Sequence, residues 1–232
     1  KNGNPVSETL HDFEFGWRHI NNRINIKSNF YWMEYFNQLV LTGAIDDVGL
    51  PIRQNVGNSR RIGLEIDSSI KFNNSLSWVF NLSISSNKNL DYFFERDGIL
   101  ESLGKTNLSF SPNWISASQI NYKISKNLNI SLLSKYVSNQ YIGNIDSKLS
   151  LLPSYLISDL NVSHVIEPLK IVKKISFSLL INNFLNKEYV SNGYFYTYDD
   201  SWSDPNSIKT IEGVGFYPQA KRNFLIGVTI LF

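Results

Sequence analysis

The chain has 232 residues, of which 14% are aromatic and only 18% are charged, and its formal net charge of +2 favours neither nucleic acid nor another highly charged partner. It contains no cysteine, which excludes a disulfide framework and thiolate metal ligands. No segment approaches the ~18 apolar residues that a membrane-spanning helix needs, whereas Phe, Tyr, Asn and Ser are plentiful, as expected for strands and turns.

Apolar and polar residues alternate along much of the chain, which predicts about nine strands after an irregular start at residues 1–7. In the first strand Phe13, Phe15 and Trp17 share one face, because side chains in a strand point alternately to opposite sides. The strands are expected at residues 10–20, 24–41, 61–72, 76–84, 106–124, 128–142, 156–163, 175–181 and 220–232.

Short and long connections alternate between these strands. The short turns are expected at residues 21–23, 73–74, 125–127 and 167–170, the long connections at 42–59, 87–105 and 191–219, and a connection of medium length at 143–153. Bacterial outer-membrane barrels have this asymmetry, with short periplasmic turns and long extracellular loops. The sequence therefore predicts an all-β fold, an antiparallel transmembrane β-barrel segment of about nine to ten strands. Because a single-chain bacterial barrel has an even number of strands, the barrel is expected to be incomplete, with at least one strand missing upstream.

The final strand is apolar to its last residue. Phe224, Ile226, Val228, Ile230 and Phe232 fall on one face. Chain ends usually fray in water, whereas a strand in a bilayer needs an apolar outer face and a fully paired backbone. This pattern resembles the C-terminal strand of bacterial outer-membrane barrels, which the barrel assembly machinery reads. The resemblance makes Phe224 and Phe232 the expected assembly signal.

Seven ionic residues are expected on the polar faces of the first and third strands. They could form a track that contacts a ligand or a plug domain. The favoured interpretation is a wetted barrel lumen, in which charges pair or stay solvated, because such barrels have polar interiors. The seven residues are Asp12, Glu14, Arg18, Arg61, Glu65, Asp67 and Lys71.

The long connection before the final strand is rich in aromatic residues. Their rings could stack on a sugar or cover a metal chelate, and an aromatic girdle at the membrane edge is the alternative. Because acidic residues share the segment, an exposed extracellular loop is favoured. Its candidate ligand-binding residues are Tyr194, Tyr196, Tyr198, Trp202 and Tyr217, and weaker candidates in an earlier loop are Tyr92, Phe93 and Phe94.

No catalytic or metal-binding constellation is predicted, so the chain is not expected to be an enzyme or to need a cofactor. His11, His19 and His164 are scattered in strands without the spacing of metal ligands. The acidic pair Asp199 and Asp200 lacks the repeated spacing of a calcium loop. No Ser lies in the sequence context of a nucleophile elbow.

Several stretches resemble TonB-dependent outer-membrane receptors, particularly those of Bacteroidetes-like bacteria. Residues 7–18 (SETLHDFEFGWR) are similar to a mid-barrel strand of the family, and residues 29–40 to the strand that follows it. Residues 182–189 (NNFLNKEY) resemble the Asn-Leu-Phe-Asn/Asp-Lys-x-Tyr motif of the penultimate strand, with Phe and Leu in reversed order. The end of the chain resembles the family's Pro-x-x-x-Arg-x-Phe-x-x-Gly-x-x-x-x-Phe ending. The matching positions are Glu8, Leu10, Glu14, Gly16, Arg18, Pro218, Arg222, Phe224, Gly227 and Phe232.

The resemblance implies that residues 1–232 are the C-terminal portion of a roughly 22-stranded barrel, whose plug domain and TonB box are absent from this chain. Its implied function is TonB-dependent uptake of a scarce nutrient, such as a ferric siderophore, across the bacterial outer membrane. The implied partners are outer-membrane lipid, the TonB complex acting through the plug, the assembly machinery and a small-molecule ligand. That ligand could be an iron chelate, cobalamin or an oligosaccharide.

Two other classes of protein stay open. One is a different outer-membrane barrel, such as a glycan importer, a pore or a barrel enzyme. The other is a soluble β-sandwich binding module, in which a second sheet would have to cover apolar faces such as that of Leu76, Trp78 and Phe80. Partition into detergent would separate a membrane barrel from the soluble module.

Overall fold

The computed structural model describes residues 5–45, 48, 50–167, 172–204 and 206–232. Within them no helix is long and apolar enough to cross a membrane. The all-β prediction is confirmed. The elements are β1 (Thr9–Ile20), β2 (Ile24–Phe36), β3 (Gln38–Ile45), β4 (Pro51–Val56), β5 (Ser59–Lys71), β6 (Leu76–Arg96), β7 (Ile99–Asn107), β8 (Trp114–Lys123), β9 (Leu128–Val137), β10 (Gln140–Tyr141), the 3-10 helix η1 (Lys148–Ser150), β11 (Leu151–Leu152), β12 (Tyr155–Ile166), β13 (Lys174–Asn182), β14 (Val190–Asp200), β15 (Lys209–Pro218) and β16 (Asn223–Leu231).

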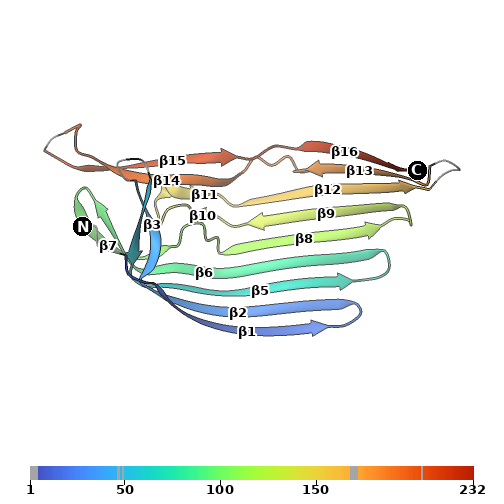
Figure 1. Ribbon diagram of the computed structural model, residues 1–232, viewed down its shortest axis with the longest axis horizontal. Coiled ribbons are helices and arrows are strands. Elements are labelled where there is room, and N and C mark those ends of the chain that lie inside the picture. The colour runs from blue at the N-terminus through green and yellow to red at the C-terminus, as the bar shows by residue number, and fades with distance from the viewer. Residues whose placement is uncertain (1–4, 46–47, 49, 168–171, 205) are drawn as a thin grey trace.

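Nine strands form the wall of one antiparallel sheet, in the order β1, β2, β5, β6, β8, β9, β12, β13 and β16, and β7 pairs with the outer part of β6. Every wall strand neighbours the wall strand that follows it along the chain. The short connections lie at one end of the sheet and the long ones at the other (Figure 1). Both the count of nine wall strands and the alternation of connections are therefore confirmed.

Asparagine side chains close two of the short turns, and the Ser125 hydroxyl closes the turn between β8 and β9. Asn21 Oδ1 accepts hydrogen bonds from the backbone N–H groups of Arg23 and Ile24, at 2.9 and 2.8 Å. Asn73 does the same between β5 and β6, because Asn side chains replace the missing backbone partners of a tight turn. The turn predicted at 167–170 lies mostly outside the described residues, which stop at 167 and resume at 172.

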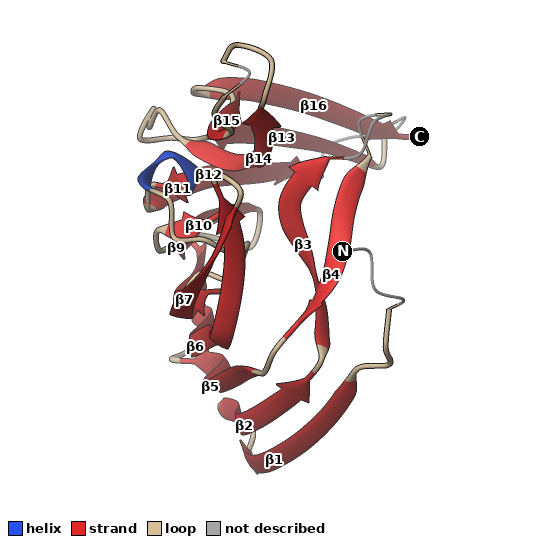
Figure 2. Ribbon diagram, turned by 90° about the vertical axis from the view of Figure 1, so that its left-hand side faces the viewer, coloured by secondary structure: helices blue, strands red, loops and turns tan. Residues whose placement is uncertain are grey.

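The sheet curves into an open trough with a convex and a concave face (Figure 2). Its register sorts the side chains by face: Phe13 lies opposite Trp32, and Trp32 lies opposite Ile62, all three on the convex face. Ile226 of β16, which is 79% exposed, also lies on this face. A convex face this apolar needs lipid around it rather than water.

Several predicted element bounds were wrong. The expected strand 24–41 ends at Phe36, because Asn37 takes a positive φ of 54° and the chain continues into the β3–β4 hairpin. The expected strands 106–124 and 128–142 shrink to β8 and β9, and the polar connection 191–219 is largely the β14–β15 hairpin. Alternation of apolar and polar residues identifies a strand whose two faces meet different surroundings. A hairpin that is surrounded by water and other loops needs no such alternation.

Strand β6 continues well beyond the wall and changes face as it does so. Asn87 and Asn89 are buried on the concave side, and after an irregularity in the register between Asn89 and Tyr92 the buried residues become Tyr92 and Phe94. A bulge of this kind shifts the alternation by one residue. The segment predicted as a loop at 87–105 is therefore mostly the β6–β7 hairpin.

The family-like motif at 182–189 has a clear structural role. Asn183 and Asn186 both have positive φ, 48° and 54°, which turns the chain between β13 and β14. The Asn183 side chain accepts from the Lys187 N–H at 2.8 Å and donates to the carbonyls of Lys187 and Ala220 at 2.7 and 3.2 Å. Asn186 accepts from the N–H of Arg222 at 3.1 Å. The motif thus joins the break before β14 to the break before β16.

Candidate functional site

The long connections meet at one end of the sheet in a structure that we call the loop cap, which comprises the described residues of 37–58, 90–113, 138–154 and 183–222. The β3–β4 hairpin crosses the open side of the trough (Figure 2), and β3 pairs in parallel with β14 at Ala44 and Thr197. Segments that are far apart in the sequence therefore join above the concave face.

The loop cap has its own hydrophobic core. Val40 of β3, Tyr92 and Phe94 of β6 and Ile145 of the connection after β9 are buried together, with Leu103 and Phe195 packed against them. Tyr92 is 1% exposed, and burial raises its pKa to about 12. Because every long connection contributes a side chain, the connections cannot move independently without opening this core.

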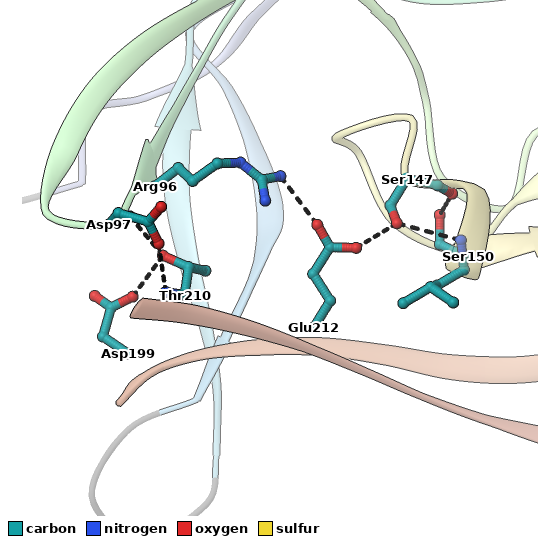
Figure 3. A network of polar contacts seen from close by, with 8 residues as sticks. Arg96, Asp97, Ser147, Ser150, Asp199, Thr210 and Glu212 are labelled. Carbon is teal, nitrogen blue, oxygen red and sulfur yellow. Dashed lines mark hydrogen bonds and ion pairs between the residues drawn. The ribbon is translucent and has the colours of Figure 1, made fainter. Parts of the chain in front are cut away.

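An ion pair links two of the connections next to this core. Arg96 Nη2, at the end of β6, lies 2.9 Å from Glu212 Oε1 of β15 (Figure 3). The other carboxylate oxygen of Glu212 accepts a hydrogen bond from the Ser147 hydroxyl, just before η1. One carboxylate therefore bridges β6 and the connection after β9. Glu212 is the more protected partner, with 15% of its side chain exposed against 35% for Arg96.

A second contact ties the β6–β7 turn to the β14–β15 hairpin. The Asp97 N–H donates to Thr210 Oγ1, and the Thr210 N–H donates to Asp97 Oδ1, each at 2.7 Å (Figure 3). The Thr210 hydroxyl in turn donates to Asp199 Oδ1 at 2.8 Å. The reciprocal pair resembles a strand contact and holds the tips of the two hairpins together.

All five aromatic residues predicted to bind ligand lie in one row along the β14–β15 hairpin, which we call the aromatic ladder. Neighbouring ring centroids from Tyr194 through Tyr196 and Tyr198 to Trp202 are 6.3, 6.4 and 6.5 Å apart, with interplanar angles of 18°, 17° and 9°. Tyr217 joins at Tyr194, with 6.0 Å between centroids. The five residues therefore form one surface, while their contact with a ligand stays a prediction.

Two glycines on β15 make the ladder possible. A Cβ on Gly213 would lie 2.3 Å from the ring of Tyr196, and one on Gly215 would lie 2.3 Å from the ring of Tyr194. The tyrosine rings therefore lean across the hairpin and cover backbone that has no side chain. Residues 213 and 215 are therefore glycines because a larger side chain would collide with these rings.

The ladder points away from the core of the loop cap. Phe195 packs against that core and Thr197 is buried at 4% exposure, so the alternate residues Tyr194, Tyr196 and Tyr198 occupy the opposite side of the hairpin. Near the tip, hydrogen bonds from Ser203 lower the pKa of Asp200. In the described part of the chain no three His, Asp or Glu residues are grouped so that they could hold a metal ion.

The other sequence predictions fall on separate surfaces. The seven predicted ionic residues lie on the concave face, where Glu14 accepts from Asn29 at 3.2 Å, Asp67 accepts from Asn81 and Arg61 stacks on Tyr35 at 4.4 Å. None of the seven makes an ion pair within the described residues. Of the weaker aromatic candidates, Tyr92 and Phe94 are buried in the cap core. The sequence did not predict the ion pair of Arg96, because its partner Glu212 lies 116 residues away and no local pattern connects the two residues.

Comparison with protein families identifies the barrel wall directly. The family model described as "TonB dependent receptor-like, beta-barrel" matches residues 2–184. The chain belongs to the TonB-dependent receptor family. A comparison with curated proteins gives no match. This receptor family lies in the bacterial outer membrane and consists of transport receptors. A wall with one apolar and one polar face fits that location.

Solved structures agree on the fold. The ferric yersiniabactin uptake receptor FyuA from Yersinia pestis is 15% identical, with a TM-score of 0.63, and the comparison covers 97% of this chain and 30% of FyuA. The siderophore receptor PiuA from Acinetobacter baumannii is 16% identical, with a TM-score of 0.64, and the comparison covers 97% of this chain and 28% of PiuA. The copper transporter OprC is 15% identical, with a TM-score of 0.64, and the comparison covers 95% of this chain and 31% of OprC. The receptor chain thus spans about 30% of the length of these structures.

Proposed function

We propose that the chain is the C-terminal part of the barrel of an active-transport receptor, which takes up a scarce nutrient such as a ferric siderophore and is driven by the TonB complex through a plug domain. The observation that carries this proposal is the loop cap: its connections interlock above the concave, bore-facing side of a receptor-family wall. A cap of this kind restricts the mouth of the bore to solutes that it recognises. The siderophore relatives support this class of ligand.

The test is growth and uptake with the intact receptor. A strain lacking the gene should fail to take up radiolabelled iron from at least one defined ferric siderophore under iron limitation, and the full-length gene should restore uptake. Restoration should disappear in a strain without TonB. If the strain lacking the gene takes up iron normally but loses growth on cobalamin or an oligosaccharide, the receptor imports that nutrient and not a siderophore. Uptake independent of TonB would indicate a passive pore instead.

We further propose that the aromatic ladder is the surface that first captures the ligand. The β14–β15 hairpin that carries it extends beyond the ends of the wall strands (Figure 1), and Trp202 at its tip is 73% exposed. Rings with free faces bind flat or apolar groups at little conformational cost. Replacing Tyr198 and Trp202 together by Ala should raise the half-saturating ligand concentration without changing the maximal uptake rate. The control is Ile208→Ala, an exposed apolar residue near the same tip. Equal kinetics in both variants would contradict the capture role.

The final strand supports the proposed contact with the assembly machinery. Phe224 on the convex face is 61% exposed, and Phe232 is 69% exposed. Deleting Phe232 from the intact receptor should lower the folded amount in the outer membrane, measured by heat-dependent gel mobility of the barrel. Assembly at normal yield would contradict the assembly role.

A further inference from the structure

A row of polar side chains crosses the convex face at the level where the wall meets the loop cap. The register places these residues directly opposite one another on successive strands, His11 to Glu34, Glu34 to Arg60, Arg60 to Lys88 and Lys88 to Asn107. All five share the convex face, since the residues beside them, such as Ser59 and Asn89, are buried on the concave side. We call this row the polar belt.

The belt lies immediately outside the apolar band of the wall. Two residues further down each strand the row consists of Phe13, Trp32, Ile62 and Ser86, and the row after it consists of Phe15, Phe30, Leu64 and Ile84. Trp and Tyr side chains favour the boundary between hydrocarbon and headgroups. Trp32 therefore marks this boundary, and the belt is level with the headgroups of the outer leaflet.

Contacts within the belt hold its cations in place. Glu34 Oε1 lies 2.5 Å from Arg60 Nε and accepts a hydrogen bond from Trp32 Nε1 at 2.7 Å, while the Arg60 guanidinium lies over the Trp32 ring, 5.6 Å from its centroid. Arg60 uses Nε for this pair, and within the described structure its two terminal nitrogens make no hydrogen bond. Its side chain is 43% exposed, so these two donors can reach a ligand on the convex side.

Lys88 is fixed in a similar way on the next strand. Its Nζ donates to Asn107 Oδ1 at 2.6 Å, and the amide nitrogen of Asn107 donates to both carboxylate oxygens of Asp146 at 3.1 and 3.0 Å. Arg60 and Lys88 face each other across β5 and β6. Like charges in this position repel each other, and of the two cations only Arg60 is paired with the carboxylate of Glu34. An anion between the two cations would remove this repulsion.

We propose that Arg60 and Lys88 bind the phosphate group of a lipid headgroup in the outer leaflet, while Trp32 contacts the upper end of the acyl region of the same lipid. Arg offers a planar fork of donors and Lys a compact charge, and both are suited to phosphate oxygens. Basic residues at a membrane surface attract anionic headgroups in the same way. The proposal rests on the membrane position of the barrel and is independent of the transported nutrient.

The experiment uses the intact receptor in nanodiscs of a zwitterionic phospholipid, titrated with lipid A that carries two phosphates and followed by native mass spectrometry. Arg60→Gln with Lys88→Gln should weaken retention of this lipid about 30-fold. The matched control is Arg61→Gln, one residue along β5 and on the concave face, which should leave retention unchanged. Heat-dependent gel mobility confirms that each variant is folded.

Chemically dephosphorylated lipid A should bind the original receptor as weakly as the phosphorylated form binds the double variant. Equal retention by the double variant and the original receptor would overturn the proposal. Loss of retention in Arg61→Gln as well would also overturn it, since the effect would then follow overall charge. Displacement of the lipid by millimolar inorganic phosphate would show a free-anion site rather than a lipid site, and would overturn the assignment to lipid.

Discussion

The barrel wall and the loop cap are built on opposite principles. The wall exposes its apolar side chains: Phe15 is 72% exposed and Ile226 79%. The buried apolar residues of the described chain, such as Val40, Tyr92 and Ile145, lie in the cap or at the outer ends of wall strands. The wall is thus sorted by two surroundings, lipid and a wet bore, whereas the cap folds in water around a small core. Damage to the cap should therefore leave the wall intact, and damage to the wall's lipid face should affect assembly first.

The largest effect is expected from removing the centre of the cap core. Tyr92→Ala should cost about 3–5 kcal/mol of local stability, as truncation of a buried aromatic residue usually does. Hydrogen exchange in the β3–β4 and β14–β15 hairpins should increase, while exchange in wall strands stays slow. The matched control is Phe93→Ala at the next position, which is 55% exposed. Increased exchange throughout the wall would show that cap and wall unfold as one unit.

The reverse test places a charge on the lipid side of the wall. Ile226→Arg should destabilise the folded barrel by about 2–4 kcal/mol, because a cation near the middle of the bilayer is poorly solvated. Leu225→Arg, one residue away on the bore side, should be tolerated, since its charge stays in water. Refolding of the intact receptor into lipid vesicles from urea measures both variants. Equal losses would contradict the assignment of the two faces.

A smaller effect is expected where the aromatic ladder covers β15. Gly215→Ala would place a methyl group against the Tyr194 ring and should cost about 1–3 kcal/mol through overpacking. Adding Tyr194→Ala should recover part of this loss, because the methyl group then has room. The stability of the hairpin in both variants is measured as the temperature at which a protease added outside the cell begins to cleave it. No recovery in the double variant would indicate that backbone conformation, not the ring, requires glycine.

The smallest effect concerns the bridging carboxylate. Glu212→Ala removes the contacts to Arg96 and Ser147 and should cost about 1 kcal/mol, since Arg96 can turn to solvent. A double-mutant cycle with Arg96→Ala isolates the ion pair, with local hydrogen exchange as the readout. The exposed Glu101→Ala on β7 is the control. A coupling energy near zero would mean that the pair adds no stability to the cap.

Much of the wall could be predicted because each wall strand separates lipid from a polar bore. That requirement imposes period two along the whole strand, so Phe13, Phe15 and Trp17 identified their face without any knowledge of their neighbours. The aromatic residues of the ladder were named together because they share one segment that is rich in aromatic residues, although that segment was expected to be a loop. The direction of the ladder was not predictable, since it depends on which side of β14 packs against Tyr92 and Phe94.

The amino-acid sequence by itself determined the all-β class, the nine wall strands, their two faces and the alternation of short turns with long connections. It did so because lipid and water act on every residue of a strand locally. Only the tertiary structure decided that the long connections share one core, that Glu212 meets Arg96 and that Arg60 faces Lys88 on the lipid side. These contacts depend on strand register and on loops that close over more than a hundred residues, and local patterning carries no information about either.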